Sequence, residues 1–125
     1  MIVSTVDGPF ELDLETGELE ASLVDPEPQP ELVLNLPRVV ASASAGSTVV
    51  AVVDAKPPLL VSHDAGTTWR DAGRGLPAGR AVAIAPDDPD TIVYATRNRL
   101  HVSRNGGVFW HALEVELPEI LGLSF

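Results

Sequence analysis

The sequence predicts an all-β fold made of three repeats, each built from four short strands. Short strand-like apolar runs, bounded by clusters of Gly, Pro, Asn and Asp, follow one another along the chain. No long stretch shows the apolar period of about 3.6 residues that marks a helix. One tract also occurs twice, and its copies start 41 residues apart (103 − 62), at Ser62 and Ser103. Self-similarity at such a period is typical of repeat folds.

The best-defined repeat covers residues 80–115, and we name its strands A to D in chain order. Its strands are expected at residues 81–84, 91–96, 99–103 and 109–113. Clusters of Pro, Asp, Asn and Gly separate them, and these residues favour turns. The preceding repeat, residues 38–72, has the same order. Its strands are expected at residues 39–45, 48–53, 59–63 and 68–72.

The first 23 residues form a third, degenerate copy that has no strand A. Aligned on the last repeat without gaps, this copy places Val3 on Val93, so residues 1–23 supply strands B, C and D. The missing strand A matches residues 120–125, at the other end of the chain. We therefore expect the C-terminal strand to complete an N-terminal repeat, and we expect it to do so in a partner chain.

The stretch of residues 24–37 is inserted between the first and second copies. It is acidic and carries prolines at alternate positions, Pro26, Pro28 and Pro30. Alternating prolines favour an extended polyproline II segment. We interpret the stretch as a solvated connection between repeats. The alternative is a lid or a peptide-like docking element on one face of the fold.

The repeated tract has the pattern S-x-[DN]-x-G-x-x-W. Its first copy is formed by Ser62, Asp64, Gly66 and Trp69, and its second copy by Ser103, Asn105, Gly107 and Trp110. The Asp or Asn oxygen can accept from backbone N–H groups of its own turn, and the glycine supplies a positive φ. The tryptophan then begins the next strand and places an apolar ring under the turn. We expect these tracts to be structural staples, with a weaker third turn at residues 13–18.

This pattern resembles the Asp-box (BNR) repeat of sialidase-like β-propellers. The resemblance implies four-stranded blades at residues 38–72 and 80–115, and a third blade at residues 1–23 completed by strand 120–125 of a partner. Three blades are too few for a ring, because propellers typically have about 4–8. We therefore expect a half β-propeller that closes a six-bladed ring as a homodimer. The alternatives are another oligomer, a separate partner chain, or a sheet that is not a propeller.

Composition argues against several classes of partner, cross-link and metal site. The net charge is −10, with 18 acidic and eight basic residues, which argues against nucleic acid and anionic membrane surfaces. Cysteine is absent, so disulfides and thiolate metal sites are excluded. No apolar run approaches the roughly 20 residues that span a bilayer. The chain enters a strand-like run at Met1 without a basic leader, so we expect a cytoplasmic protein.

Basic side chains suggest where a ligand would bind. In a propeller, loops alternate between two faces, and the resemblance places ligands on the face with the B–C and D–A loops. Most of the basic residues fall on that face, and the candidate ligand-binding residues are Arg74, Arg80, Arg97 and Arg99. Guanidinium groups suit carboxylates and phosphates. The alternative is that these arginines only balance neighbouring acidic residues.

Catalytic residues are not predicted. A sialidase-like reaction requires a tyrosine nucleophile with a glutamate partner, and the chain's one tyrosine, Tyr94, lies in a strand without such a glutamate beside it. The three histidines are dispersed, and the acidic cluster at residues 87–90 lacks the spacing of a Ca²⁺ loop. We therefore expect no metal and no cofactor.

The sequence predicts a non-catalytic binding or scaffold module of unknown ligand. Besides a second copy of the chain, its partner is expected to be a protein or a glycan. The first alternative is a lectin-like module that binds glycans or small anions through the candidate arginines. The second is a glycoside hydrolase of the sialidase type. Fold alone does not decide between these functions.

Overall fold

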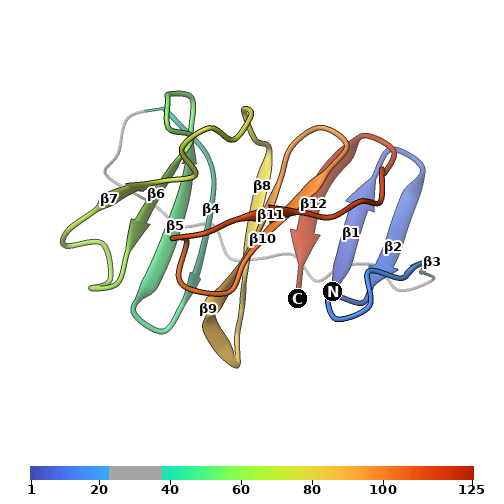
Figure 1. The fold of residues 1–125 in the computed structure, drawn as a ribbon, viewed down its shortest axis with the longest axis horizontal. Helices are drawn as coiled ribbons and strands as arrows, with labels where there is room; N and C mark the ends of the chain where they lie inside the picture. The colour runs from blue at the N-terminus through green and yellow to red at the C-terminus, as the bar shows by residue number, and fades with distance from the viewer. Residues whose placement is uncertain (23–37) are drawn as a thin grey trace.

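The computed structural model describes residues 1–22 and 38–125, so the expected insertion at residues 24–37 lies outside the described residues. Twelve strands form three four-stranded antiparallel sheets (Figure 1). This architecture confirms the all-β fold of three four-stranded repeats. We call the sheets the first, second and third blades, in the order of the repeats. No helix among the described residues is long and apolar enough to cross a bilayer.

The second and third blades follow the chain order, each strand pairing with the next. The second blade contains β4 (Val39–Ala45), β5 (Thr48–Val53), β6 (Leu59–Ser62) and β7 (Arg70–Ala72). The third blade contains β8 (Ala81–Ala85), β9 (Asp88–Ala95), β10 (Leu100–Ser103) and β11 (His111–Ala112). The strands expected at residues 39–45 and 48–53 are confirmed. β11 is shorter than expected because residues 108 and 109 belong to the preceding turn.

Both ends of the chain build the first blade. It contains β12 (Ile120–Ser124), β1 (Ile2–Thr5), β2 (Gly8–Leu12) and β3 (Leu19–Ala21), in that order across the sheet. β12 pairs with β1 antiparallel, with Leu123 opposite Val3, and the two termini lie close together in Figure 1. The C-terminal strand therefore completes the N-terminal repeat, as its sequence predicts.

The pairing differs from the expectation in one respect, because β12 joins β1 of its own chain rather than that of a partner. A strand tethered to the same chain reaches the free edge of β1 without the entropic cost of association. The sequence alignment identifies which strands pair, but it is the same whether the two strands belong to one chain or to two.

The first strand of each repeat lies on the inside of the structure. β8 contacts β4 on one side and β12 on the other, so the third blade lies between the second and the first (Figure 1). The blades thus form an arc in the order second, third, first. Because both faces of the third blade are covered, its strands are apolar on both faces, as is typical of doubly covered strands.

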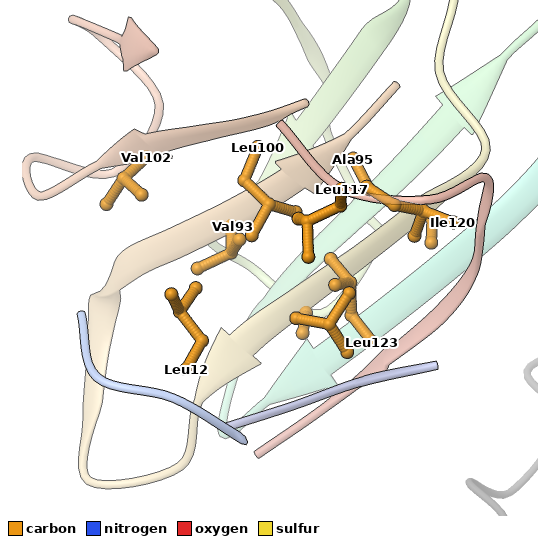
Figure 2. Packing of buried hydrophobic residues seen from close by; sticks show 11 residues of the cluster. Leu12, Val93, Ala95, Leu100, Val102, Leu117, Ile120 and Leu123 are labelled. Atoms are coloured by element: carbon orange, nitrogen blue, oxygen red, sulfur yellow. The ribbon is translucent and has the colours of Figure 1, made fainter. Parts of the chain in front are cut away.

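Two apolar clusters fill the spaces between the blades. The cluster between the third and first blades includes Val93, Val102, Leu12 and Leu123, whose side chains converge in Figure 2. The cluster between the second and third blades joins residues of β5 and β6 to residues of β8 and β9, including Tyr94. Val50, Val52, Ile92 and Tyr94 are all fully buried in this second cluster.

Candidate functional site

Antiparallel blades have two distinct ends. One end, at the top of Figure 1, carries the β5–β6 and β9–β10 turns and the β7–β8 and β11–β12 connections; we call it the connection end. The opposite end carries the β4–β5 and β8–β9 turns and the turns that lead into the last strand of each blade; we call it the motif end. Backbone bonds support this division, since the Ala65 N–H donates to the Ser47 carbonyl at the motif end, at 2.9 Å.

The first turn motif, residues 62–69, is a closed network of hydrogen bonds at the motif end. The Ser62 hydroxyl donates to Asp64 Oδ1 at 2.7 Å and accepts from the Gly66 N–H at 2.8 Å. Asp64 Oδ1 also accepts from the Thr68 N–H at 2.8 Å, and its Oδ2 accepts from the Thr68 hydroxyl. A Cβ added at Gly66 would lie 3.5 Å from the Trp69 ring, which is half-buried beneath the turn.

The second turn motif, residues 103–110, repeats this geometry. The Ser103 hydroxyl donates to Asn105 Oδ1 at 3.0 Å and accepts from the Gly107 N–H at 2.9 Å. Asn105 Oδ1 accepts from the Phe109 N–H at 2.9 Å, so phenylalanine keeps the backbone contact and loses only the hydroxyl contact that Thr68 makes. The Trp110 indole N–H donates to the Gly107 carbonyl at 3.0 Å. The amide oxygen of asparagine thus replaces the carboxylate.

The weaker third turn, at residues 13–18, uses a different acceptor. Asp13 Oδ1 accepts from the Glu15 N–H at 2.8 Å and from the Thr16 N–H at 3.3 Å. The alignment places Glu15 at the acceptor position, but the aspartate two residues earlier takes that role. Its shorter side chain can reach back to its own turn, as Asx turns require.

The contacts of Asp64 stabilise its charged form. The Thr68 hydroxyl, then the Thr68 N–H and the Ser62 hydroxyl lower the pKa of Asp64 from 3.8 to about 2. Because the pKa is lower in the folded chain than in the unfolded chain, this contribution is present above about pH 4 and is lost as the pH falls toward 2. The carboxylate therefore acts as an acceptor that holds the turn.

Replacing Ser103 with alanine should lower the free energy of unfolding by about 1–3 kcal/mol, because the buried Gly107 N–H loses its acceptor. Urea denaturation measures the change. Ser44→Ala, at an exposed position of β4, is the control and should stay within about 0.5 kcal/mol of wild type. Equal effects of the two substitutions would show that the hydroxyl does not hold the turn.

The structure divides the four candidate arginines into two groups. Arg80 Nη1 and Arg97 Nε both contact Glu119 Oε1, at 2.8 and 3.3 Å. Arg99 Nη2 contacts Glu116 Oε1 at 3.0 Å. These contacts gather three arginines at the connection end, each beside a carboxylate of the β11–β12 connection. Arg74 lies apart from them.

Arg74 lines a groove at the connection end, between the β5–β6 turn and the β7–β8 connection. The groove consists of two hollows of about 620 and 650 Å³ that share several residues. The shared residues are Lys56, Pro58, Gly75 and Leu76. Pro57, Asp71 and Arg74 complete the first hollow, and Asp54, Ala55, Pro77 and Ala78 complete the second. Proline and leucine surfaces therefore lie beside charged groups of both signs.

Tyr94 anchors one wall of this groove. Its phenol is buried between the second and third blades and donates to the Pro77 carbonyl at 2.6 Å. Burial raises the pKa of Tyr94 to about 12, so the phenol stays neutral at physiological pH. The Tyr94 ring also packs edge-on against Trp110, with centroids 6.2 Å apart. This tyrosine is part of the core and is not placed to act as a nucleophile.

His101 is a buried polar group of the third blade. Its Nε2 is buried and has no hydrogen-bond partner within residues 1–22 and 38–125, and its ring lies 6.1 Å from that of Tyr94. Burial lowers the pKa of His101 from its usual 6.5, and the positive charge of Arg99 lowers it further. The folded chain therefore favours the neutral imidazole.

Acidification from about pH 7 to about pH 5 should reduce the free energy of unfolding, because the unfolded chain binds a proton at His101 more readily than the folded chain. The contribution is fully present above the unfolded pKa of 6.5 and declines as the pH falls toward the lower folded value. Urea denaturation across this range tests the effect. His101→Leu should flatten the pH dependence of the free energy of unfolding. The control His111→Gln, at an exposed position, should leave that pH dependence unchanged. An unchanged pH dependence in His101→Leu would contradict this explanation.

Metal coordination finds no support in the described part of the chain. Within residues 1–22 and 38–125, no group of three or more His, Asp or Glu side chains is arranged to hold an ion. The acidic cluster at residues 87–90 instead spans the β8–β9 turn and the start of β9. There the Asp88 carboxylate accepts from the Thr91 hydroxyl at 2.8 Å.

Sequence reasoning missed most of the residues that line the groove. It selected Arg74, which lines the groove, but not Lys56, Pro57, Pro58 or Leu76. The Lys-Pro-Pro sequence in the β5–β6 turn was an available signal, because it places apolar rings beside a cation in a loop.

Two solved structures resemble this fold. The crystal structure of the GH74 enzyme of Niastella koreensis matches with a TM-score of 0.54 and 27% identity, over 70% of this chain and 13% of that chain. The structure of YCF48 bound to D1 peptide matches with a TM-score of 0.52 and 23% identity, over 67% of this chain and 28% of that chain. No protein-family model matches the chain, and no curated protein matches it either.

Both similar structures are β-propellers, so the comparisons support a propeller-like fold for this chain. The chain spans less than a third of the length of either of them. Three blades in an arc agree with that partial coverage.

Proposed function

We propose that this chain is a protein-binding β-propeller module that holds an extended peptide segment in the groove at its connection end. One observation carries the proposal, namely that the groove combines apolar proline and leucine surfaces with charged rim residues. Each hollow lies in the size range of known ligand sites, about 300–1,000 Å³. An extended peptide offers both apolar side chains and backbone polar groups to such a surface.

Contacts at the connection end favour this function over the alternatives. A lectin-like or small-anion site built on all four candidate arginines would need them free, but Arg80, Arg97 and Arg99 already contact glutamates. A sialidase-type reaction would need an accessible tyrosine, but Tyr94 is fully buried. The structure of YCF48 bound to D1 peptide adds an example of a similar fold that holds a peptide.

We also propose that the two turn motifs are Asp boxes. Their shared pattern and matching hydrogen bonds support this assignment. Their role here is structural, because they lie at the motif end, away from the groove. The cytoplasmic location expected from the sequence stays a prediction.

We further propose that two copies associate as a homodimer with six blades. The three blades form an arc, whose first and second blades each have one face that no other blade of the described residues covers. The uncovered face of the first blade can pack on the uncovered face of the second blade in another copy, and a two-fold axis repeats this contact. Light scattering should give twice the 13.2 kDa chain mass, and a monomer at micromolar concentration would contradict the homodimer without affecting the groove.

Selection of phage-displayed random peptides on the immobilised chain tests the peptide-binding function. Ala55→Trp fills the second hollow from an exposed position, and Thr67→Trp is a matched control at the motif end. Selected peptides should bind wild type and Thr67→Trp equally, and Ala55→Trp at least about tenfold more weakly, as fluorescence anisotropy measures. Recovery of no binding peptides, or equal binding to Ala55→Trp, would contradict the proposal.

A further inference from the structure

The basic side chains of this chain fall into two classes. All eight lie within the described residues, and five of them have partners. Arg80, Arg97, Arg99 and Arg104 contact glutamates, and Arg70 donates to the Gly106 carbonyl at 2.8 Å. Among residues 1–22 and 38–125, no carboxylate pairs with Arg38, Lys56 or Arg74.

Two of the three cations without carboxylate partners line the groove. Lys56 lines both hollows and Arg74 lines the first. Arg38 lines neither hollow, and only its backbone carbonyl is tied to the groove, accepting from the Asp54 N–H at 3.0 Å. All three side chains are exposed. In a chain of net charge −10, this is where cations remain available to a ligand.

We infer that the peptide bound in this groove carries a carboxylate next to an apolar side chain, an inference that rests on the proposed peptide-binding function. The carboxylate matches the cations, and the apolar side chain matches Pro57, Pro58 and Leu76. Its source is either an Asp or Glu side chain or the C-terminus of the peptide, since both present the same group to Lys and Arg.

Carboxylates of the groove limit the charge of this ligand. Asp54 and Asp71 also line it, so the two carboxylates balance the charges of Lys56 and Arg74. A single carboxylate placed beside Lys56 and Arg74 suits this mixed lining, whereas a polyanion such as nucleic acid would face repulsion from both aspartates and from the acidic remainder of the chain.

Four synthetic peptides of alternating proline and leucine test the inference by fluorescence anisotropy. The first has one central glutamate and capped ends, the second has glutamine in its place, the third has glutamine and a free C-terminus, and the fourth has lysine and capped ends. The glutamate or the free C-terminal peptide should bind about three- to tenfold more tightly than the capped glutamine peptide. The lysine peptide should bind most weakly. Whichever carboxylate peptide binds more tightly identifies the source of the group.

Charge variants test whether the preference for a carboxylate arises from residues of the groove. Lys56→Met and Arg74→Met should each remove most of the preference for the carboxylate, while Asp71→Asn should increase it. Arg104→Met, at the motif end, is the matched control and should change nothing. Raising the ionic strength should weaken only the carboxylate peptides, because rim charges are screened by salt.

Failure of this inference is distinguishable from failure of the proposed function. Equal binding of all four peptides, with loss of binding in Ala55→Trp, would keep the peptide groove and overturn the carboxylate preference. A preference that persists in Lys56→Met and Arg74→Met would overturn it as well. If none of the four peptides binds wild type, the carboxylate inference is overturned, and the peptide groove is overturned as well only if phage selection also recovers no binding peptides.

Discussion

Deletion of residues 120–125 is expected to abolish the folded state. β12 supplies Ile120 and Leu123 to the cluster between the first and third blades, and its loss would expose the edge of β1. Circular dichroism and size-exclusion chromatography should show an unfolded or aggregated chain.

A single substitution tests the same contact more gently. Ile120 is fully buried, so Ile120→Ala should lower the free energy of unfolding by about 2–5 kcal/mol. Leu121→Ala is a matched control in the same strand, because Leu121 lies at the irregularity in the β1–β12 ladder and is 60% exposed. It should change the free energy by no more than about 0.5 kcal/mol. Equal losses in urea denaturation would show that β12 does not pack in the core.

Gly79→Ala is expected to have the second large effect. A Cβ at Gly79 would overlap the ring of Tyr94, which is buried and cannot move aside. The substitution should cost about 1–3 kcal/mol or more, as overpacking does. Gly122→Ala is the control, since nothing lies within 4 Å of a Cβ at that position.

A double-mutant cycle identifies the cause of this effect. Tyr94→Ala alone should cost about 3–5 kcal/mol. In that background Gly79→Ala should cost little more, because the ring that it would overlap is gone. Additive losses in urea denaturation would contradict the overlap. Because Tyr94 also donates to the Pro77 carbonyl, both substitutions should weaken peptide binding in the groove.

Much of the fold was predictable because each repeat carries its own local signals. Alternating turn clusters and valine-rich runs predicted β5 and the third blade. Aligning Val3 with Val93 showed that the first repeat lacks strand A, and the match of residues 120–125 to strand A then identified β12 as the strand that completes the first blade. The register is the same within one chain or between two, so the sequence could not show that β12 pairs with its own β1.

The groove was less predictable because it depends on contacts between distant residues. Lys56 and Arg74 belong to different connections and meet only after the second blade has folded. The sequence grouped Arg74 with Arg80 because both follow β7, yet Arg80 contacts Glu119, 39 residues away. Ion pairs of that kind leave no periodic signal, and they decide which arginines remain free.

The most direct test of this account is disulfide trapping of the β1–β12 pair. The chain has no cysteine, and Ser4 lies opposite Gly122 in the ladder, so a cysteine pair at these positions should form a disulfide. Two single variants, Ser4→Cys and Gly122→Cys, are refolded together and oxidised, beside the double variant oxidised alone. Mass spectrometry under non-reducing conditions should find an internal disulfide within single chains of the double variant and no covalent dimer joining the two single variants. A covalent dimer of Ser4→Cys with Gly122→Cys would show that the C-terminal strand completes the blade of a partner.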